Sequence, residues 1–124
     1  VYETWAMSPN MVFYSEKIYK CILNFHPFIT WANPDTMKYL IKNGYKTFSP
    51  HINESYDSEY DIEERSTLLL KEMMRLCDMN VKDLLDWYGN QSEILIHNYN
   101  HFMNNNHLQK SGDKFLKVYD KVVK

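Results

Sequence analysis

Residues 13–29 constrain the fold most, because a helix pattern and a strand pattern meet within them. Ser15 is a favourable N-cap residue. Apolar residues then recur at helical spacing on one face, at Ile18, Cys21, Ile22 and Phe25. Pro27 ends the helix, and residues 28–32 form an almost continuous apolar run, as in a strand buried on both faces. The stretch therefore predicts a helix that leads directly into a buried strand.

Short strands and helices alternate on both sides of this stretch. Residues 1–4 are rich in β-favouring side chains and predict a first strand. Asn33-Pro34 predicts the start of a second helix, with Met37, Leu40 and Ile41 on its buried face and Gly44 at its end. Residues 45–48 predict a third strand. We therefore expect an α/β fold, a partial Rossmann-like domain with a small parallel sheet of two or three strands.

The remainder of the chain has a helical pattern. Residues 49–60 form an acidic, aromatic loop, and Asp61 is placed to cap a long helix. The inner face of that helix is predicted to hold Ile62, Leu69, Met73 and Leu76. We expect residues 1–103 to form the main domain, with this helical portion at its end, and residues 104–124 to form a connector and a final helix.

Composition limits the classes of partner and the location. The chain has 124 residues and a formal net charge of −2, which favours neither nucleic acid nor an anionic membrane as a partner. No apolar run approaches the roughly 20 residues that span a bilayer.

Cys21 and Cys77 are predicted to be reduced core thiols, and we expect a cytoplasmic protein. The chain begins at Val1 and few strands are visible, which predicts either a fragment or a homodimer that pairs strand edges.

Glu16 and Lys17 are candidate binding residues because they stand in the first turn of the first predicted helix. The free N–H groups there favour an anion, Lys17 adds a positive charge, and a carboxylate can accept hydrogen bonds from sugar hydroxyls. Glu3 follows at the carboxyl end of the first predicted strand, which would face the same crevice. The alternative is that Glu16 only stabilises the helix and Lys17 is a solvated surface residue.

Two further groups of polar residues suggest metal binding. His97 and His101 share a helix face, but no acidic residue of a zinc motif lies between them. The loop containing Asp57 is acidic, but it lacks the spacing of a calcium-binding loop. Ordinary surface histidines and a solvated loop are favoured, so we predict no metal site, and a metal-binding helical module stays the weaker alternative.

Several motifs together resemble one enzyme family. They are V-x-E-T at residues 1–4, FYSEKI at 13–18, HPFI at 26–29, MKYLIKNGYKTF at 37–48 and NESYDSEYDIEER at 53–65. This pattern resembles the C-terminal, nucleotide-sugar-binding half of the α-1,3-fucosyltransferase-like glycosyltransferases, which have two Rossmann domains (GT-B), in a branch found in viral and environmental bacterial sequences. The resemblance covers about residues 1–103.

The resemblance implies a role for four residues in binding the donor. Glu16 would contact the ribose or sugar, Lys17 would neutralise the diphosphate, Glu3 would be an acid beside the donor, and Phe13 would lie near the base. The donor would be a nucleotide sugar, GDP-linked in many members, and no other cofactor is implied. No catalytic residue is implied in this chain, because the acceptor-binding half and the general base of the family lie upstream.

The function expected from the resemblance is that of a glycosyltransferase fragment. It would bind a nucleotide-diphosphate sugar, and a missing domain would bind a glycan or another hydroxyl acceptor. Whether the chain itself is an enzyme stays open. The alternative is a non-catalytic binding or interaction module that keeps the same fold.

Overall fold

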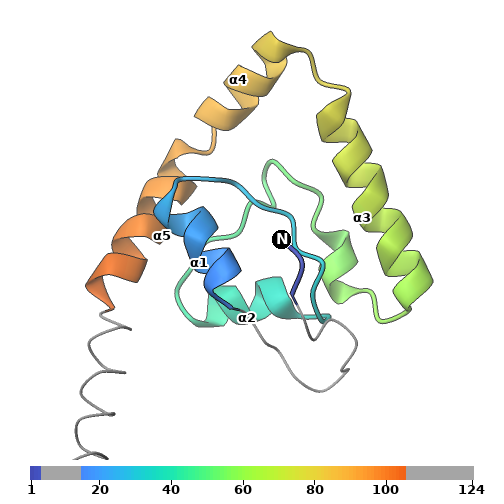
Figure 1. Cartoon of the computed structure of the whole chain (residues 1–124), viewed down its shortest axis with the longest axis horizontal. Helices are drawn as coiled ribbons and strands as arrows, with labels where there is room; N and C mark the ends of the chain where they lie inside the picture. The colour runs from blue at the N-terminus through green and yellow to red at the C-terminus, as the bar shows by residue number, and fades with distance from the viewer. Residues whose placement is uncertain (4–14, 106–124) are drawn as a thin grey trace, which may run out of the picture.

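The computed structural model describes residues 1–3 and 15–105, and these residues form a helical fold (Figure 1). The elements in chain order are α1 (Glu16–Leu23), α2 (Thr36–Lys42), the short 3₁₀ helix η1 (Ser55–Ser58), α3 (Ile62–Cys77), α4 (Val81–Gly89) and α5 (Ser92–Asn104).

The predicted α/β fold with a parallel sheet is wrong. In the described residues the only β-pairing is an isolated parallel bridge between Tyr2 and Trp31. Around it, the Glu3 N–H donates to the Trp31 carbonyl at 2.9 Å, and the Trp31 N–H donates to the Val1 carbonyl at 2.7 Å. Two of the predicted strand segments therefore do lie side by side and parallel, but over too few residues to form strands.

The third predicted strand, residues 45–48, is an irregular segment, and the side chain of a residue in α5 makes hydrogen bonds to its backbone. Asn98 of α5 accepts from the Lys46 N–H at 2.8 Å and donates to the Lys46 carbonyl at 2.8 Å. Asn98 is almost fully buried. A side-chain amide thus makes the two backbone hydrogen bonds that a neighbouring strand would make in a sheet.

The core lies between α1, α2, α5 and the loops that join them. Its members are Ile18, Ile22, Phe28, Met37, Leu40, Tyr45, Phe48, Ile52, Ile94 and Leu95. The predicted burial of Ile18 and Ile22 is therefore confirmed, as is that of Met37 and Leu40, whereas Ile41 is exposed.

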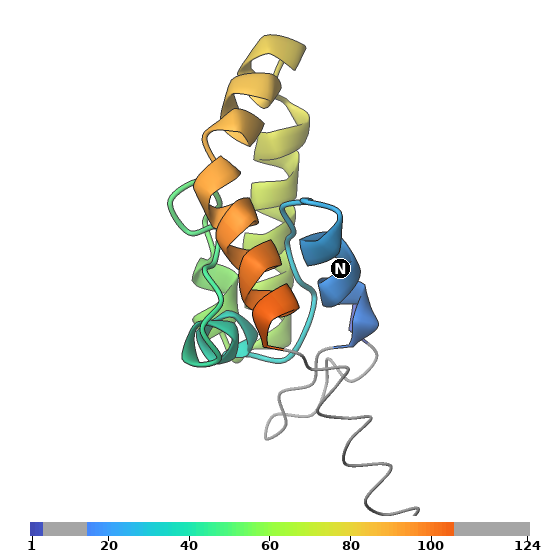
Figure 2. The same cartoon turned by 90° about the vertical axis from the view of Figure 1, so that its left-hand side faces the viewer.

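α1 packs along α5, at the left of Figure 1 and as seen from the side in Figure 2. Two aromatic contacts join the α1 region to α5. The ring centroids of Tyr19 and Phe102 lie 5.0 Å apart, and those of Phe25 and Tyr99 lie 4.7 Å apart in a stacked pair. Aromatic pairs at these separations add to the stability of the contact beyond the area that they bury.

The starts of two helices follow the capping predictions. Ser15 caps α1, because its hydroxyl oxygen accepts from the Lys17 N–H. Asp61 caps α3, because its carboxylate accepts from the N–H groups of Glu63 and Glu64, each at 3.0 Å. The second helix begins two residues later than Asn33-Pro34 predicts, at Thr36.

α3 and α4 form a hairpin that projects from the core as an open V, with its tip at the top of Figure 1. The hairpin is attached through both of its helices: the Arg65 guanidinium at the start of α3 lies 5.5 Å from the centre of the Trp31 ring, and Trp87 and Tyr88 of α4 donate hydrogen bonds to backbone carbonyls outside the hairpin. α4 has no buried residue. On α3 only Leu69 of the predicted inner face is buried, while Ile62 and Met73 are exposed, so that prediction is largely wrong.

Three further predictions concern the two cysteines, the absence of a membrane span and the division of the chain near residue 103. Cys21 is half-buried and Cys77 is exposed, both with free thiols, so Cys77 is not a core residue. No helix in the described ranges combines the length and the apolar character needed to cross a membrane. Residues 106–124 lie outside the described part, and the proposed division of the chain near residue 103 stays a prediction.

Candidate functional site

Glu3 lies against the beginning of α1 and holds it. Its carboxylate accepts a hydrogen bond from the Ser15 N–H at 3.0 Å through one oxygen and from the Ser15 hydroxyl at 2.8 Å through the other. The same hydroxyl oxygen then accepts from the Lys17 N–H at 3.3 Å. Glu3 is only 1% exposed, so this contact is part of the interior. The tie between residue 3 and residue 15 fixes where α1 starts.

Three of the four predicted donor-binding residues are thereby brought to one end of α1. Glu16 is exposed in the first helical turn, and within the described residues its carboxylate has no hydrogen-bond partner. Lys17 is half-buried beside it. Phe13 lies outside the described residues. The two oxygens of Glu3 already bind Ser15, so an additional anion at this helix end would have to overcome the charge of Glu3.

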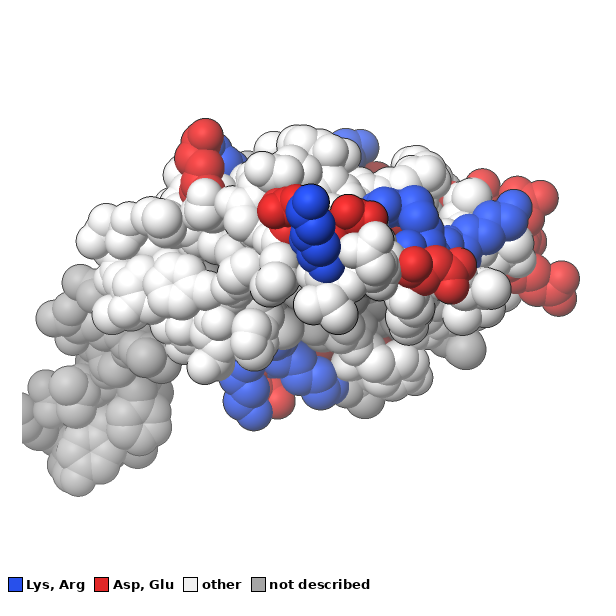
Figure 3. All heavy atoms as spheres, turned by 90° about the horizontal axis from the view of Figure 1, so that it is seen from above, with Lys and Arg blue, Asp and Glu red and all other residues white. Residues whose placement is uncertain are grey.

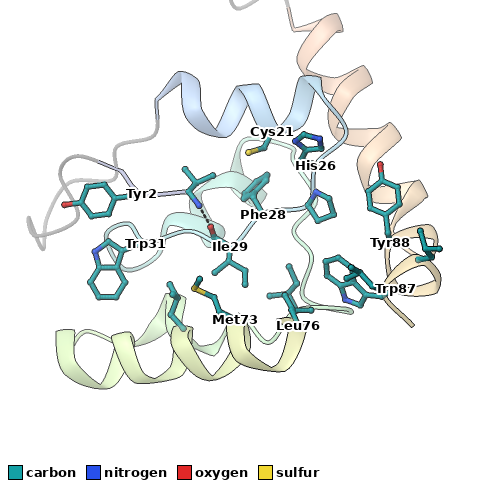
Figure 4. Close-up of a pocket in the computed structure, with 16 residues that line it drawn as sticks. Tyr2, Cys21, His26, Phe28, Ile29, Trp31, Met73, Leu76, Trp87 and Tyr88 are labelled. Atoms are coloured by element: carbon teal, nitrogen blue, oxygen red, sulfur yellow. Dashed lines mark hydrogen bonds between the residues drawn. The ribbon is translucent and has the colours of Figure 1, made fainter. Parts of the chain in front are cut away.

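A second feature is a large apolar recess that the sequence interpretation missed (Figure 4). It has a volume of about 810 Å³, within the range of roughly 300–1,000 Å³ that is typical of ligand pockets. Its walls come from α1 and the following loop, from α3 and from α4. Side chains that point into it include Cys21, Phe28, Met73, Leu76, Trp87 and Tyr88.

The polar groups in the α4 wall of the recess are tied to the backbone. The Trp87 indole N–H donates to the His51 carbonyl at 3.0 Å, and the Tyr88 hydroxyl donates to the Phe25 carbonyl at 3.0 Å. Burial also raises the pKa of the Cys21 thiol, which keeps it protonated and uncharged near neutral pH. The recess is therefore suited to apolar groups rather than to a charged substrate.

One signal in the sequence could have pointed to this recess. The segment from residue 69 to residue 88 carries many large apolar residues and contains no glycine or proline. Two helices with more apolar surface than the core can cover predict an exposed apolar face.

The histidine pair connects α5 to the end of α2. The Nε2 atoms of His97 and His101 lie 2.9 Å from the Gly44 carbonyl oxygen and 2.7 Å from the Asn43 carbonyl oxygen, respectively. The two rings are stacked, with centroids 5.9 Å apart. Carbonyls at a helix end attract N–H donors, so this pair has a structural role. In the described part of the chain, no group of three or more potential metal ligands is present.

The acidic loop also has a structural role. The Asp57 carboxylate accepts from the Met37 N–H at 2.9 Å and from the Lys38 N–H at 3.3 Å, so it caps α2 from a distant part of the chain. The Glu54 carboxylate accepts from the Phe48 N–H at 2.9 Å. Burial raises the pKa of both carboxyl groups. Tyr56 of this loop is buried and helps to fill the interior.

Comparison of the chain with family models, with curated proteins and with solved structures found no match. The candidate sites therefore stand on the sequence and on the geometry described above.

Proposed function

We propose that this chain binds the nucleotide diphosphate of a sugar donor at the start of α1, as part of a glycosyltransferase. The observation that carries the proposal is the placement of Glu3 against Ser15, directly before Glu16 and Lys17. These residues belong to the V-x-E-T and FYSEKI motifs, which resemble the donor-binding half of the fucosyltransferase-like enzymes. The proposed binding site does not require the predicted sheet. It depends on the residues gathered at the start of α1 and on the sequence motifs.

In this proposal the three residues have different roles. Glu3 is a positioning residue, because both of its oxygens are engaged with Ser15. Glu16 is exposed and can accept hydrogen bonds from the hydroxyl groups of the ribose or the sugar. Lys17 supplies the positive charge that a diphosphate needs, and this charge also offsets that of Glu3. Positive charge beside the diphosphate would stabilise the leaving group during sugar transfer.

The test is thermal unfolding of the full chain with GDP, UDP and CDP. A ligand present at one hundred times its dissociation constant stabilises the folded state by about 2.7 kcal/mol, which is a shift of several degrees in a domain of this size. We expect one nucleotide to give such a shift and Glu16→Gln and Lys17→Met to remove it. Lys20→Met, an exposed lysine in the last turn of the same helix, is the matched control and should keep the shift.

Two results would overturn the proposal. In the first, none of the three nucleotides raises the unfolding temperature of the wild type. In the second, Lys20→Met removes the shift as completely as Lys17→Met, which would indicate a general attraction of the anion to positive surface. A parallel titration with Zn²⁺ tests the histidine pair, whose Nε2 atoms lie against the carbonyl oxygens of Gly44 and Asn43, directly after α2.

A non-catalytic interaction module is the second candidate. The observation that favours it is the apolar recess, which is unsuited to a charged donor and is bordered by exposed apolar helices. Exposed apolar surface of this kind marks sites that bind other proteins. Nucleotide binding separates the two candidates, because an interaction module has no reason to be stabilised by GDP, UDP or CDP.

A further inference from the structure

The loop between α2 and η1 makes hydrogen bonds to both helices of the α3–α4 hairpin. The His51 carbonyl oxygen accepts from the Arg75 guanidinium of α3 and from the Trp87 indole of α4, each at 3.0 Å. Two residues further on, the Asn53 N–H donates to the Glu72 carboxylate of α3, also at 3.0 Å. Because one carbonyl serves both helices, the hairpin cannot move away from this loop without breaking these bonds.

Residues 51–53 of this loop, which we name the latch, are anchored in the core. Ile52 is 2% exposed and is a member of the core cluster. The N–H groups of His51 and Ile52 both donate to the Phe48 carbonyl, at 2.8 Å and 2.7 Å. The loop extends from α2 toward the inside of the V that the hairpin forms (Figure 1). The latch therefore joins the hairpin to a fixed part of the molecule.

The helical chain is interrupted at both ends of the hairpin. Before α3, Glu59 and Tyr60 belong to no helix, and after α4 the chain passes through Asn90 and Gln91 to the start of α5. A Cβ atom at Gly89, the last residue of α4, would meet no atom within 4 Å outside its own stretch of helix. Close packing therefore does not require this glycine, which leaves the backbone freer than another residue would.

We propose that the α3–α4 hairpin is a flap that pivots about these two ends, and that the latch holds it in the position seen here. The walls of the recess that come from α3 and α4 belong to the flap, whereas the wall from α1 and the following loop does not (Figure 4). Release of the latch therefore changes the width of the recess, while the core and its helices stay folded.

Short-range contacts, rather than long-range charge, set the position of the flap. Acidic and basic side chains are interspersed with uncharged surface on the face that looks onto the tip of the hairpin (Figure 3), so the field there is weak. α4 has no buried residue, so its apolar side chains hold it only weakly. The hydrogen bonds of the latch then have a large share in the balance, and losing one of them shifts it on the order of tenfold.

This proposal is independent of donor binding at α1, and its test measures the distance between the flap and α5. One spin label is attached to Cys77, an exposed native thiol at the end of α3, and the other through Asn100→Cys at an exposed position of α5. Cys21→Ala removes the remaining thiol. With the latch intact, double electron–electron resonance should give one narrow distribution of distances.

The latch is released by combining Arg75→Lys with Trp87→Phe. The lysine keeps a positive charge beside the buried Glu72 and the phenyl ring keeps an aromatic group in place, but both bonds to the His51 carbonyl are lost. We expect the distribution to broaden and a second distance to appear. Lys46→Met is the matched control, because it removes an ion pair of 2.6 Å outside the flap, and it should keep the narrow distribution.

Two further measurements separate a pivoting flap from general loosening of the fold. Hydrogen exchange at the Asn53 N–H follows the latch directly, because this exposed residue donates to Glu72. Release of the latch should speed this exchange on the order of tenfold and leave the amide groups of α5 unchanged. Adding Gly89→Ala should stiffen one pivot and lower the fraction of the second distance about two- to fivefold.

Four results would each overturn the proposal. They are an unchanged distance distribution after release of the latch, a broadened distribution in Lys46→Met, equal acceleration of exchange at Asn53 and in α5, and a fraction of the second distance that Gly89→Ala does not lower.

Discussion

Leu40 and Leu70 are the same residue type on two helices of one chain, but the structure uses them in opposite ways. Leu40 of α2 is 1% exposed in the compact half, which comprises α1, α2, α5 and their connecting loops. Leu70 of α3 is 55% exposed on the hairpin. The compact half is held by its own core, whereas the hairpin presents apolar surface outward. The difference indicates that the core of the compact half supplies most of the stability of the fold, whereas the hairpin leaves large apolar side chains in contact with solvent.

The largest expected effect comes from truncating these two leucines. Leu40→Ala should lower the free energy of unfolding by about 2–5 kcal/mol, because it leaves a cavity in the core. Leu70→Ala should change it by no more than about 0.5 kcal/mol, because the side chain is already in water. Urea unfolding followed by circular dichroism measures both. Equal effects of the two substitutions would break the comparison between the compact half and the hairpin.

A smaller effect is expected at Asn98, which replaces a neighbouring strand for the Lys46 backbone. Asn98→Ala leaves one buried donor and one buried acceptor without their partner, which costs on the order of 2–4 kcal/mol. Asn24→Ala is the matched control, because the Asn24 amide also donates to a backbone carbonyl, that of Lys20, but at the surface. If both variants unfold at the same urea concentration, Asn98 does not hold the irregular segment in place.

The smallest effect is a pair of opposite pH dependences. Burial raises the pKa of Glu54 in the compact half above its ordinary value of 4.5, while the Arg75 side chain lowers the pKa of Glu72 on α3 below it. The contribution of Glu54 to stability is therefore present at pH values below 4.5 and is lost as the pH rises through its folded pKa. The contribution of Glu72 is present above pH 4.5 and is lost as the pH falls through its folded pKa.

Glu54→Gln and Glu72→Gln test these signs in urea unfolding between about pH 3 and pH 7, a range that spans the ordinary carboxyl pKa. Relative to Glu54→Gln, the wild type should lose stability as the pH rises. Relative to Glu72→Gln, it should lose stability as the pH falls. Two differences that run in the same direction would mean that the environments of the two carboxyl groups are alike.

The helices could be predicted from the sequence, but the sheet could not be excluded from it. Ser15 and Asp61 act on N–H groups two or three residues ahead, so their capping roles follow from neighbours in the chain. An apolar run such as residues 28–32 is compatible with burial against strands or against helices. Here Phe28 packs on Phe48, with ring centroids 5.1 Å apart, and among the described residues the β-pairing of the run is limited to the Tyr2–Trp31 bridge.

The candidate sites divide in the same way. The motifs predicted Glu16 and Lys17 as neighbours of a helix start, and α1 begins there. The engagement of both Glu3 oxygens by Ser15 could not be predicted, because it joins residues twelve positions apart in the chain. The recess was missed because its walls come from separate segments of the chain, whose distances depend on how the hairpin is attached.

The sequence by itself determined where most of the helices lie, since capping and helical spacing act within a few residues. The tertiary structure alone decided that the apolar segments pack against helices instead of forming a sheet, and that the other described residues leave apolar side chains of the α3–α4 hairpin exposed. The physical reason is that burial is not directional: an apolar side chain gains the same free energy against a helix as against a strand. Which of the two it meets is settled by long-range contacts such as that of Asn98 with Lys46.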